Sequence, residues 1–290
     1  MLFRASLLLL LLSTSSFALA DNPPQELGEL LWHEDYGTAF HAARKKQRML
    51  LIHFDGEDQH TENLQATLAD EEVQGLCRQF ELLRVPADYE IAFDNRTKLL
   101  SHSSFAAMGN KPGLAIVDLR DTDSEHFGQT VSALPFGRSL YYAPSLTSKQ
   151  AITTLLELPT GSITQRSMVL AVRLHPERPA STLGRADAYV FQEAAGHSAH
   201  MAHTGVQGHQ GFETRFHRIN ANLGGSAAKE VVAESWPGED LLAACFSCVK
   251  SWRGSPGHWS AVSGSHASYG YDIRRSSRGV WYATGLFADR

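Results

Sequence analysis

The chain has 290 residues, of which 43% are hydrophobic and 20% are charged, and its formal net charge at pH 7 is −5. A negative chain of this composition has enough apolar residues to bury a core but no general attraction for phosphate backbones, so we expect no nucleic-acid partner. Three cysteines are too few for a disulfide scaffold, and hydrophobic packing must therefore hold the fold together.

The first 20 residues have the pattern of a cleavable export signal. Arg4 supplies the positive charge, residues 7–12 form the apolar segment, and residues 18–20 form a cleavage site of small residues. No later segment reaches the roughly 20 apolar residues that a membrane-spanning helix needs, so we expect no transmembrane segment in the mature chain. The sequence predicts a bacterial protein that is exported and is periplasmic or extracellular.

Predicted strands and helices alternate over residues 21–160. The predicted strands cover 49–54, 81–85, 113–118 and 127–134, and the predicted helices cover 35–46, 61–80, 95–108 and 146–156. Apolar runs bounded by turn residues indicate the strands, and apolar positions spaced along one face indicate the helices. This alternation is typical of an α/β domain with helices on both faces of its sheet.

The order of these elements, with Pro112 just ahead of a strand, resembles the thioredoxin fold over roughly residues 31–159. Where thioredoxins carry Cys-x-x-Cys, this chain has Gln59-His60-Thr61-Glu62. Without a thiolate there is no nucleophile for disulfide exchange. The resemblance therefore implies a redox-inactive thioredoxin-like domain, which would serve as a scaffold or a docking surface.

A change in composition after Pro159 separates this domain from a second one. We expect a linker or entry strand at 161–184, with a strand at 165–174 and a proline-bearing loop at 175–181, and a second domain at 185–290. The predicted helices of that domain cover 186–203, 212–223 and 239–252, and its extended segments cover 230–234, 269–273 and 279–287. The last two segments are expected to pair as antiparallel strands.

Several motifs of the second domain resemble one known family. They are His197-Ser-Ala-His-Met-Ala202, His209, Arg215, Glu230-Val-Val-Ala233, Trp252-Arg-Gly-Ser-Pro-Gly-His258 and Tyr269-Gly-Tyr271. Together they are similar to the CAP superfamily, whose SCP-like domains include cysteine-rich secretory proteins, venom antigen 5 and plant pathogenesis-related proteins. Trp-x-x-Ser-Pro-Gly-His is matched closely, whereas Lys229 and Val231 replace the usual residues around the family glutamate.

The resemblance implies an α-β-α sandwich with a cleft that holds two histidines and an acidic residue. Carried over position by position, these residues are His209, Glu230 and His258, with Glu234 as the alternative to Glu230. Ser255 stands where the family has a second glutamate, so one acidic member of the usual set is absent.

Two neutral imidazoles and one carboxylate are suited to hold zinc or another divalent cation and to leave a position open. Nearby, His197, His200 and His203 share one face of a predicted helix because their spacing is three residues. A stripe on a single helix does not close a four-coordinate site, so we expect these three side chains to pack around the metal ligands rather than to bind the ion.

Three functions remain open from the sequence. The first is an exported binding protein whose cleft takes a divalent metal, an unknown small ligand or a protein partner. The second is a metal-dependent hydrolase that uses the same three residues to activate water. The third is thiol–disulfide chemistry through Cys245 and Cys248, which lie on nearly one face of a predicted helix. The chain has neither the His-Glu-x-x-His motif of zinc proteases nor the Gly-x-Ser-x-Gly motif of serine hydrolases, so these two motifs give no support to a hydrolase function.

Overall fold

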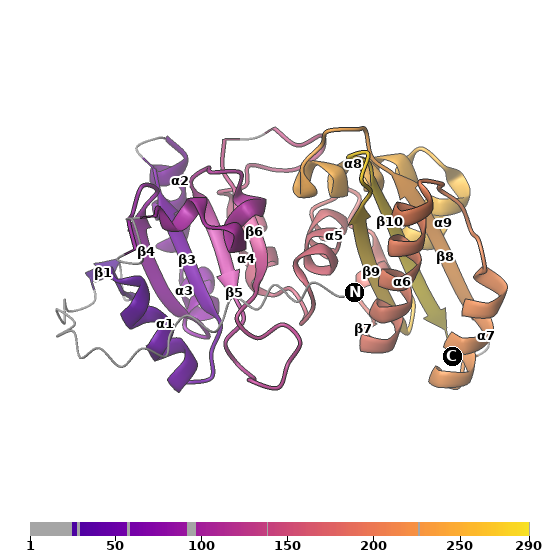
Figure 1. Cartoon of the computed structure of the whole chain (residues 1–290), viewed down its shortest axis with the longest axis horizontal. Helices are drawn as coiled ribbons and strands as arrows, with labels where there is room; N and C mark the ends of the chain where they lie inside the picture. The colour runs from indigo at the N-terminus through magenta and orange to yellow at the C-terminus, as the bar shows by residue number, and fades with distance from the viewer. Residues whose placement is uncertain are drawn as a thin grey trace. The chain divides into compact units, whose positions relative to one another are not determined.

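The computed structural model describes residues 25–27, 30–56, 59–91, 97–137, 139–225 and 227–289. The protein is α/β and divides into two compact units, the first running to residue 137 and including 147–149, the second comprising 138–146 and the chain from residue 150 on (Figure 1). This division falls earlier than the boundary expected at residue 160. The export signal predicted at 1–20 lies outside the described residues.

The first unit contains a four-stranded sheet in the order β4-β3-β5-β6. Strands β3 and β4 are parallel, whereas β5 is antiparallel to both β3 and β6. The strands of this sheet are β3 (Leu50–Asp55), β4 (Glu81–Pro86), β5 (Gly113–Val117) and β6 (Thr130–Pro135). The other elements are β1 (Gln25–Leu27), β2 (Leu30–Trp32), α1 (Tyr36–Lys45), α2 (Gln59–Leu68) and α3 (Glu71–Cys77).

Two predicted helices of this unit are interrupted. The helix expected over 61–80 breaks into α2 and α3, because the side chain of Asp70 accepts hydrogen bonds from the backbone of Glu72 and Val73 and so caps a new helix. The segment expected as a helix over 95–108 instead forms two short 3₁₀ helices, η2 (Leu99–Ser101) and η3 (Ser103–Met108), where it is described. His102 lies between them with extended backbone.

The second unit contains a four-stranded sheet in the order β7-β9-β10-β8. Strand β10 pairs antiparallel with β8 and β9, and the short β7 runs parallel to β9. The strands are β7 (Arg185–Ala186), β8 (Ala227–Glu234), β9 (Ser268–Arg275) and β10 (Trp281–Asp289). The helices are α4 (Lys149–Leu156), which begins where the first unit ends, α5 (Ile163–Arg173), α6 (Ala188–Thr204), α7 (Phe212–Leu223), α8 (Leu241–Arg253) and α9 (Pro256–Ser263), together with η4 (Ala180–Thr182).

Helices cover both faces of this second sheet. On one face, Leu286 of β10 packs with Val190 of α6 and Ile219 of α7. On the other face, Tyr271 of β9 packs against Trp252 of α8, with ring centroids 5.9 Å apart. Successive side chains of a strand point to opposite faces of the sheet, so every second residue of β8 faces α6 and α7.

The strand predicted at 165–174 is wrong, since these residues form helix α5. Ser162 and Gln165 form a reciprocal capping box that starts the helix. Residues 168–172 are all buried and all apolar. This stretch therefore lacks the alternation of apolar and polar positions by which a helix with one buried face is recognised in a sequence. Within the described residues, no helix has both the length and the apolar character required to cross a membrane.

Candidate functional site

The carboxylate of Glu230 lies at the centre of the candidate site. Glu230 sits on β8 opposite Leu286 of β10, on the sheet face that α6 and α7 cover. Its side chain is 0% exposed. Arg215 of α7 approaches it closely: Nε donates to Oε2 at 2.8 Å, and Nη2 lies 2.6 Å from the same oxygen. The buried carboxylate is therefore neutralised by a guanidinium that is itself only 8% exposed.

His209 occupies the loop between α6 and α7. This loop is defined by two glycines with left-handed backbone, Gly205 at the end of α6 and Gly211 just before α7. The Nδ1 atom of His209 lies 2.9 Å from Oε1 of Glu230. Because an ionised carboxylate only accepts hydrogen bonds, Nδ1 donates this bond, and in the neutral ring Nε2 keeps a lone pair for a ligand. The His209 side chain is 47% exposed, so solutes have access to it.

His258 enters the site from a third segment of the chain. Helix α9 begins at Pro256, a residue suited to the first helical position because it has no N–H to satisfy, and His258 is in the first turn. Its ring centroid lies 6.0 Å from that of His209. Burial lowers the pKa of His258, and the neighbouring His209 lowers it further, which favours the neutral imidazole. The structure thus places His209 next to both Glu230 and His258.

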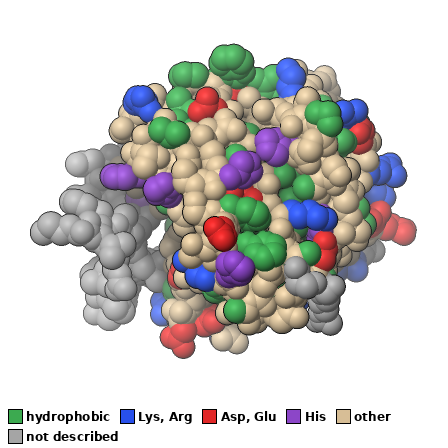
Figure 2. Space-filling model, turned by 90° about the vertical axis from the view of Figure 1, so that its right-hand side faces the viewer, with side chains coloured by type: hydrophobic (Ala, Val, Ile, Leu, Met, Phe, Trp, Pro, Cys, Tyr) green, Lys and Arg blue, Asp and Glu red, His purple; other side chains and the backbone are tan. Residues whose placement is uncertain are grey.

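The three histidines of α6 differ in position. His197 is 2% exposed, donates from Nε2 to the carbonyl oxygen of Gly208 at 2.8 Å, and lies 3.7 Å from Oε1 of Glu230. The ring of His200 stacks on that of His197, with centroids 6.3 Å apart. His203 instead lines a smaller pocket with Arg274 and neighbours. Figure 2 shows histidine side chains gathered on one face of this unit.

The alternative acidic residue, Glu234, does not replace Glu230 at the site. It lies four residues further along β8, where it is exposed and pairs in register with Tyr282 rather than with Leu286. A strand advances about 3.3 Å per residue, which places the two glutamates roughly 13 Å apart along β8.

The geometry changes the role expected for Glu230. Both of its oxygens are engaged, one by His209 and the other by Arg215, so it orients His209 instead of offering a free oxygen to a metal. Within the part of the chain that the structure describes, no group of three or more His, Cys, Asp or Glu side chains is arranged to hold a metal ion. A divalent cation at this site would accordingly be held by His209 and His258, with water or a ligand completing its coordination.

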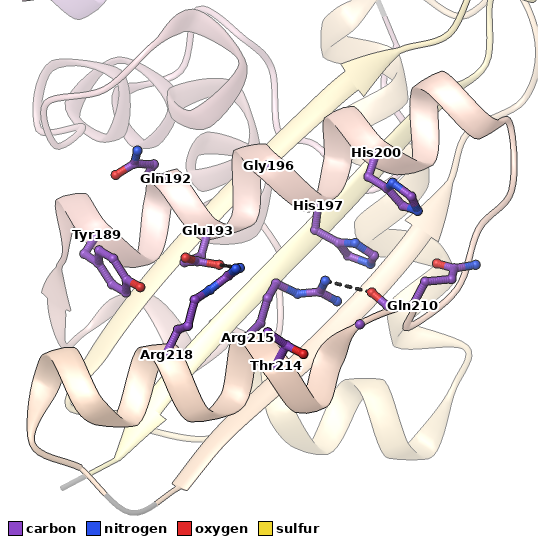
Figure 3. A pocket seen from close by; sticks show the side chains of 11 residues that line it. Tyr189, Gln192, Glu193, Gly196, His197, His200, Gln210, Thr214, Arg215 and Arg218 are labelled. Atoms are coloured by element: carbon purple, nitrogen blue, oxygen red, sulfur yellow. Dashed lines mark hydrogen bonds and ion pairs between the residues drawn. The ribbon is translucent and has the colours of Figure 1, made fainter.

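A pocket of about 740 Å³ lies beside this site, between α6 and α7 (Figure 3). It is lined by Tyr189, Gln192, Glu193, Gly196, His197, His200, Gln210, Gly211, Thr214, Arg215 and Arg218. None of the sequence motifs predicts this pocket. The signal was a polar stripe at four-residue spacing on each of two successive predicted helices, Tyr189-Glu193-His197 on the first and Thr214-Arg218 on the second.

Cys245 and Cys248 are free thiols buried within α8. Burial raises the pKa of both, which disfavours the thiolate needed for exchange. We expect Ellman's reagent to label none of the three cysteines of the native chain and all three after denaturation. Rapid labelling of the native chain, or thiols that are released only by reductant, would contradict this expectation.

No family model matches the chain, and neither a curated protein nor a solved structure matches it.

Proposed function

We propose that the chain is an exported binding protein in which His209 and His258 form the contact surface for a divalent cation or a small ligand. The observation that carries this proposal is the bond between Nδ1 of His209 and the inaccessible carboxylate of Glu230. That bond fixes the orientation of the exposed ring and directs its second nitrogen away from the core. Orienting a ring before the ligand arrives lowers the entropy cost of binding.

The family resemblances on which the proposal draws imply an α/β architecture, and the structure is α/β in both units. Helices on both faces of the sheet in the second unit agree with a CAP-type sandwich. In the first unit, the strand order with one parallel and two antiparallel pairs agrees with a thioredoxin-like domain. One departure concerns Pro112, which matches the position of the cis-proline of thioredoxins: the described residues contain no cis peptide bond, so the bond before Pro112 is trans. A scaffold role remains our proposal for this unit.

Binding is favoured over metal-dependent hydrolysis for two reasons. Catalytic zinc sites usually have three protein ligands, whereas two imidazoles are available here. The carboxylate that would act as general base is buried and paired with Arg215, so it has no path to a metal-bound water. The buried thiols give no observation in favour of thiol–disulfide chemistry.

Zinc titration of the purified chain tests the proposed site. We expect saturable binding of one zinc ion by calorimetry, and a loss of at least about tenfold in affinity in His258→Ala and in His209→Ala, because each removes one of two ligands. His203→Ala is the matched control and should bind as the unaltered chain does, because that residue lines a different pocket. If zinc does not bind, or if His258→Ala binds it equally well, the cation form of the proposal is wrong.

A further inference from the structure

The pocket between α6 and α7, here called the α6–α7 pocket, is separate from the imidazole pair. None of His209, Glu230 and His258 lines it. Its volume of about 740 Å³ falls within the range of roughly 300–1,000 Å³ typical of small-molecule sites. Figure 3 shows side chains from both helices pointing into the space between them. The pocket therefore has the size and the walls of a site of its own.

The charges of the pocket are matched within the protein. Arg218 of α7 forms an ion pair with Glu193 of α6, with 2.5 Å between Nη2 and Oε2. Arg215 is paired with Glu230 behind the pocket wall. An anionic ligand would have to compete with these carboxylates, and a cationic ligand would meet two guanidinium groups. Matched charges of this kind favour a neutral ligand that forms hydrogen bonds with both the guanidinium and the carboxylate groups.

His197 favours a ligand that donates a hydrogen bond. Its Nε2 donates to the carbonyl oxygen of Gly208, so Nδ1 has a lone pair and acts as an acceptor. That Nδ1 atom is buried and has no hydrogen-bond partner. A buried acceptor without a donor costs free energy, which a ligand hydroxyl group would recover. The ring of His200, an exposed residue, stacks on that of His197 on the same side of α6, with centroids 6.3 Å apart.

We propose that the α6–α7 pocket binds a neutral carbohydrate of about disaccharide size. Sugar hydroxyls both donate and accept, which suits the groups that line the pocket: the acceptor of His197, the amide of Gln192, the hydroxyl of Thr214 and the Arg218–Glu193 pair. Tyr189 supplies an aromatic ring at the end of the same pocket, where the apolar face of a sugar ring can pack (Figure 3).

Titration with three neutral disaccharides tests the proposal: maltose, cellobiose and N,N′-diacetylchitobiose, followed by calorimetry and by amide shifts of the ¹⁵N-labelled chain. We expect at least one to bind at a single saturable site, with shifts in α6 and α7. Gln192→Ala and Thr214→Val should each weaken it about tenfold, which is about 1.4 kcal/mol. Gln150→Ala is the control, since this exposed glutamine lies on another helix.

Three results would overturn the proposal. The first is that none of the three disaccharides binds. The second is that glucose 6-phosphate binds more tightly than every neutral sugar, which would show that the pocket selects an anion. The third is that the sugar is lost in His258→Ala, which would place it at the imidazole pair. Retained sugar binding in His258→Ala together with lost zinc binding would separate this site from the cation site.

Discussion

Replacing Glu230 with alanine is expected to lower the free energy of unfolding by about 3–5 kcal/mol, because it leaves the charge of Arg215 buried without a partner. The carboxylate is 0% exposed and the guanidinium 8%, so water replaces the lost contact poorly. His209 loses its hydrogen bond to Oε1 of Glu230 in the same variant. Urea unfolding followed by circular dichroism and by tryptophan fluorescence measures the change.

Two further variants separate the ion pair from the strand that carries it. Glu234→Ala alters an exposed glutamate of the same strand and should change the unfolding free energy by no more than about 0.5 kcal/mol. Arg215→Met combined with Glu230→Ala should cost less than the two single changes together, since no unpaired charge remains in the interior. Equal losses in Glu230→Ala and Glu234→Ala would contradict the role assigned to the buried pair.

The residues of the candidate site were predictable from the sequence, but their roles were not. His209 and His258 carry local signals, because glycines around the first and Pro256 before the second set the backbone that presents each ring. The role of Arg215 depends on how α7 packs against β8, a contact that no spacing in the sequence states. For this reason the sequence predicts Glu230 as a metal ligand, whereas the structure engages both of its oxygens within the protein.

The helices and strands with a clear local sequence pattern were predictable, whereas those that depend on packing or capping were not. Strands β3, β4 and β5 and helices α6 and α7 were predicted to within about two residues at each end, because a single face of each helix or a compact apolar run marks them. Helix α5 was mistaken for a strand because tertiary packing buries it on nearly all sides. The break at Asp70 was missed because a capping side chain competes locally with a longer helix.

Acid is expected to destabilise the first unit through His53. This residue of β3 is 1% exposed, and its pKa is lowered from 6.5 to about 4; burial is the main cause, the charge of Asp55 opposes it and the charge of Arg84 adds to it. The folded chain thus keeps the imidazole neutral over a range in which the unfolded chain binds a proton. The stability contribution is complete above pH 6.5 and is lost as the pH falls from 6.5 towards 4, by about 3 kcal/mol in all.

His53→Leu removes this titration and should flatten the decline in stability between pH 6.5 and 4. The change costs little at pH 7, because Nε2 of His53 has no hydrogen-bond partner to lose. Hydrogen exchange of the β3 and β5 amides measures the stability of the first unit specifically. His41→Leu, at an exposed position of α1, is the control and should leave the slope of stability against pH unchanged. An unchanged slope in His53→Leu would mean that carboxylates, and not this buried imidazole, set the acid sensitivity of the sheet.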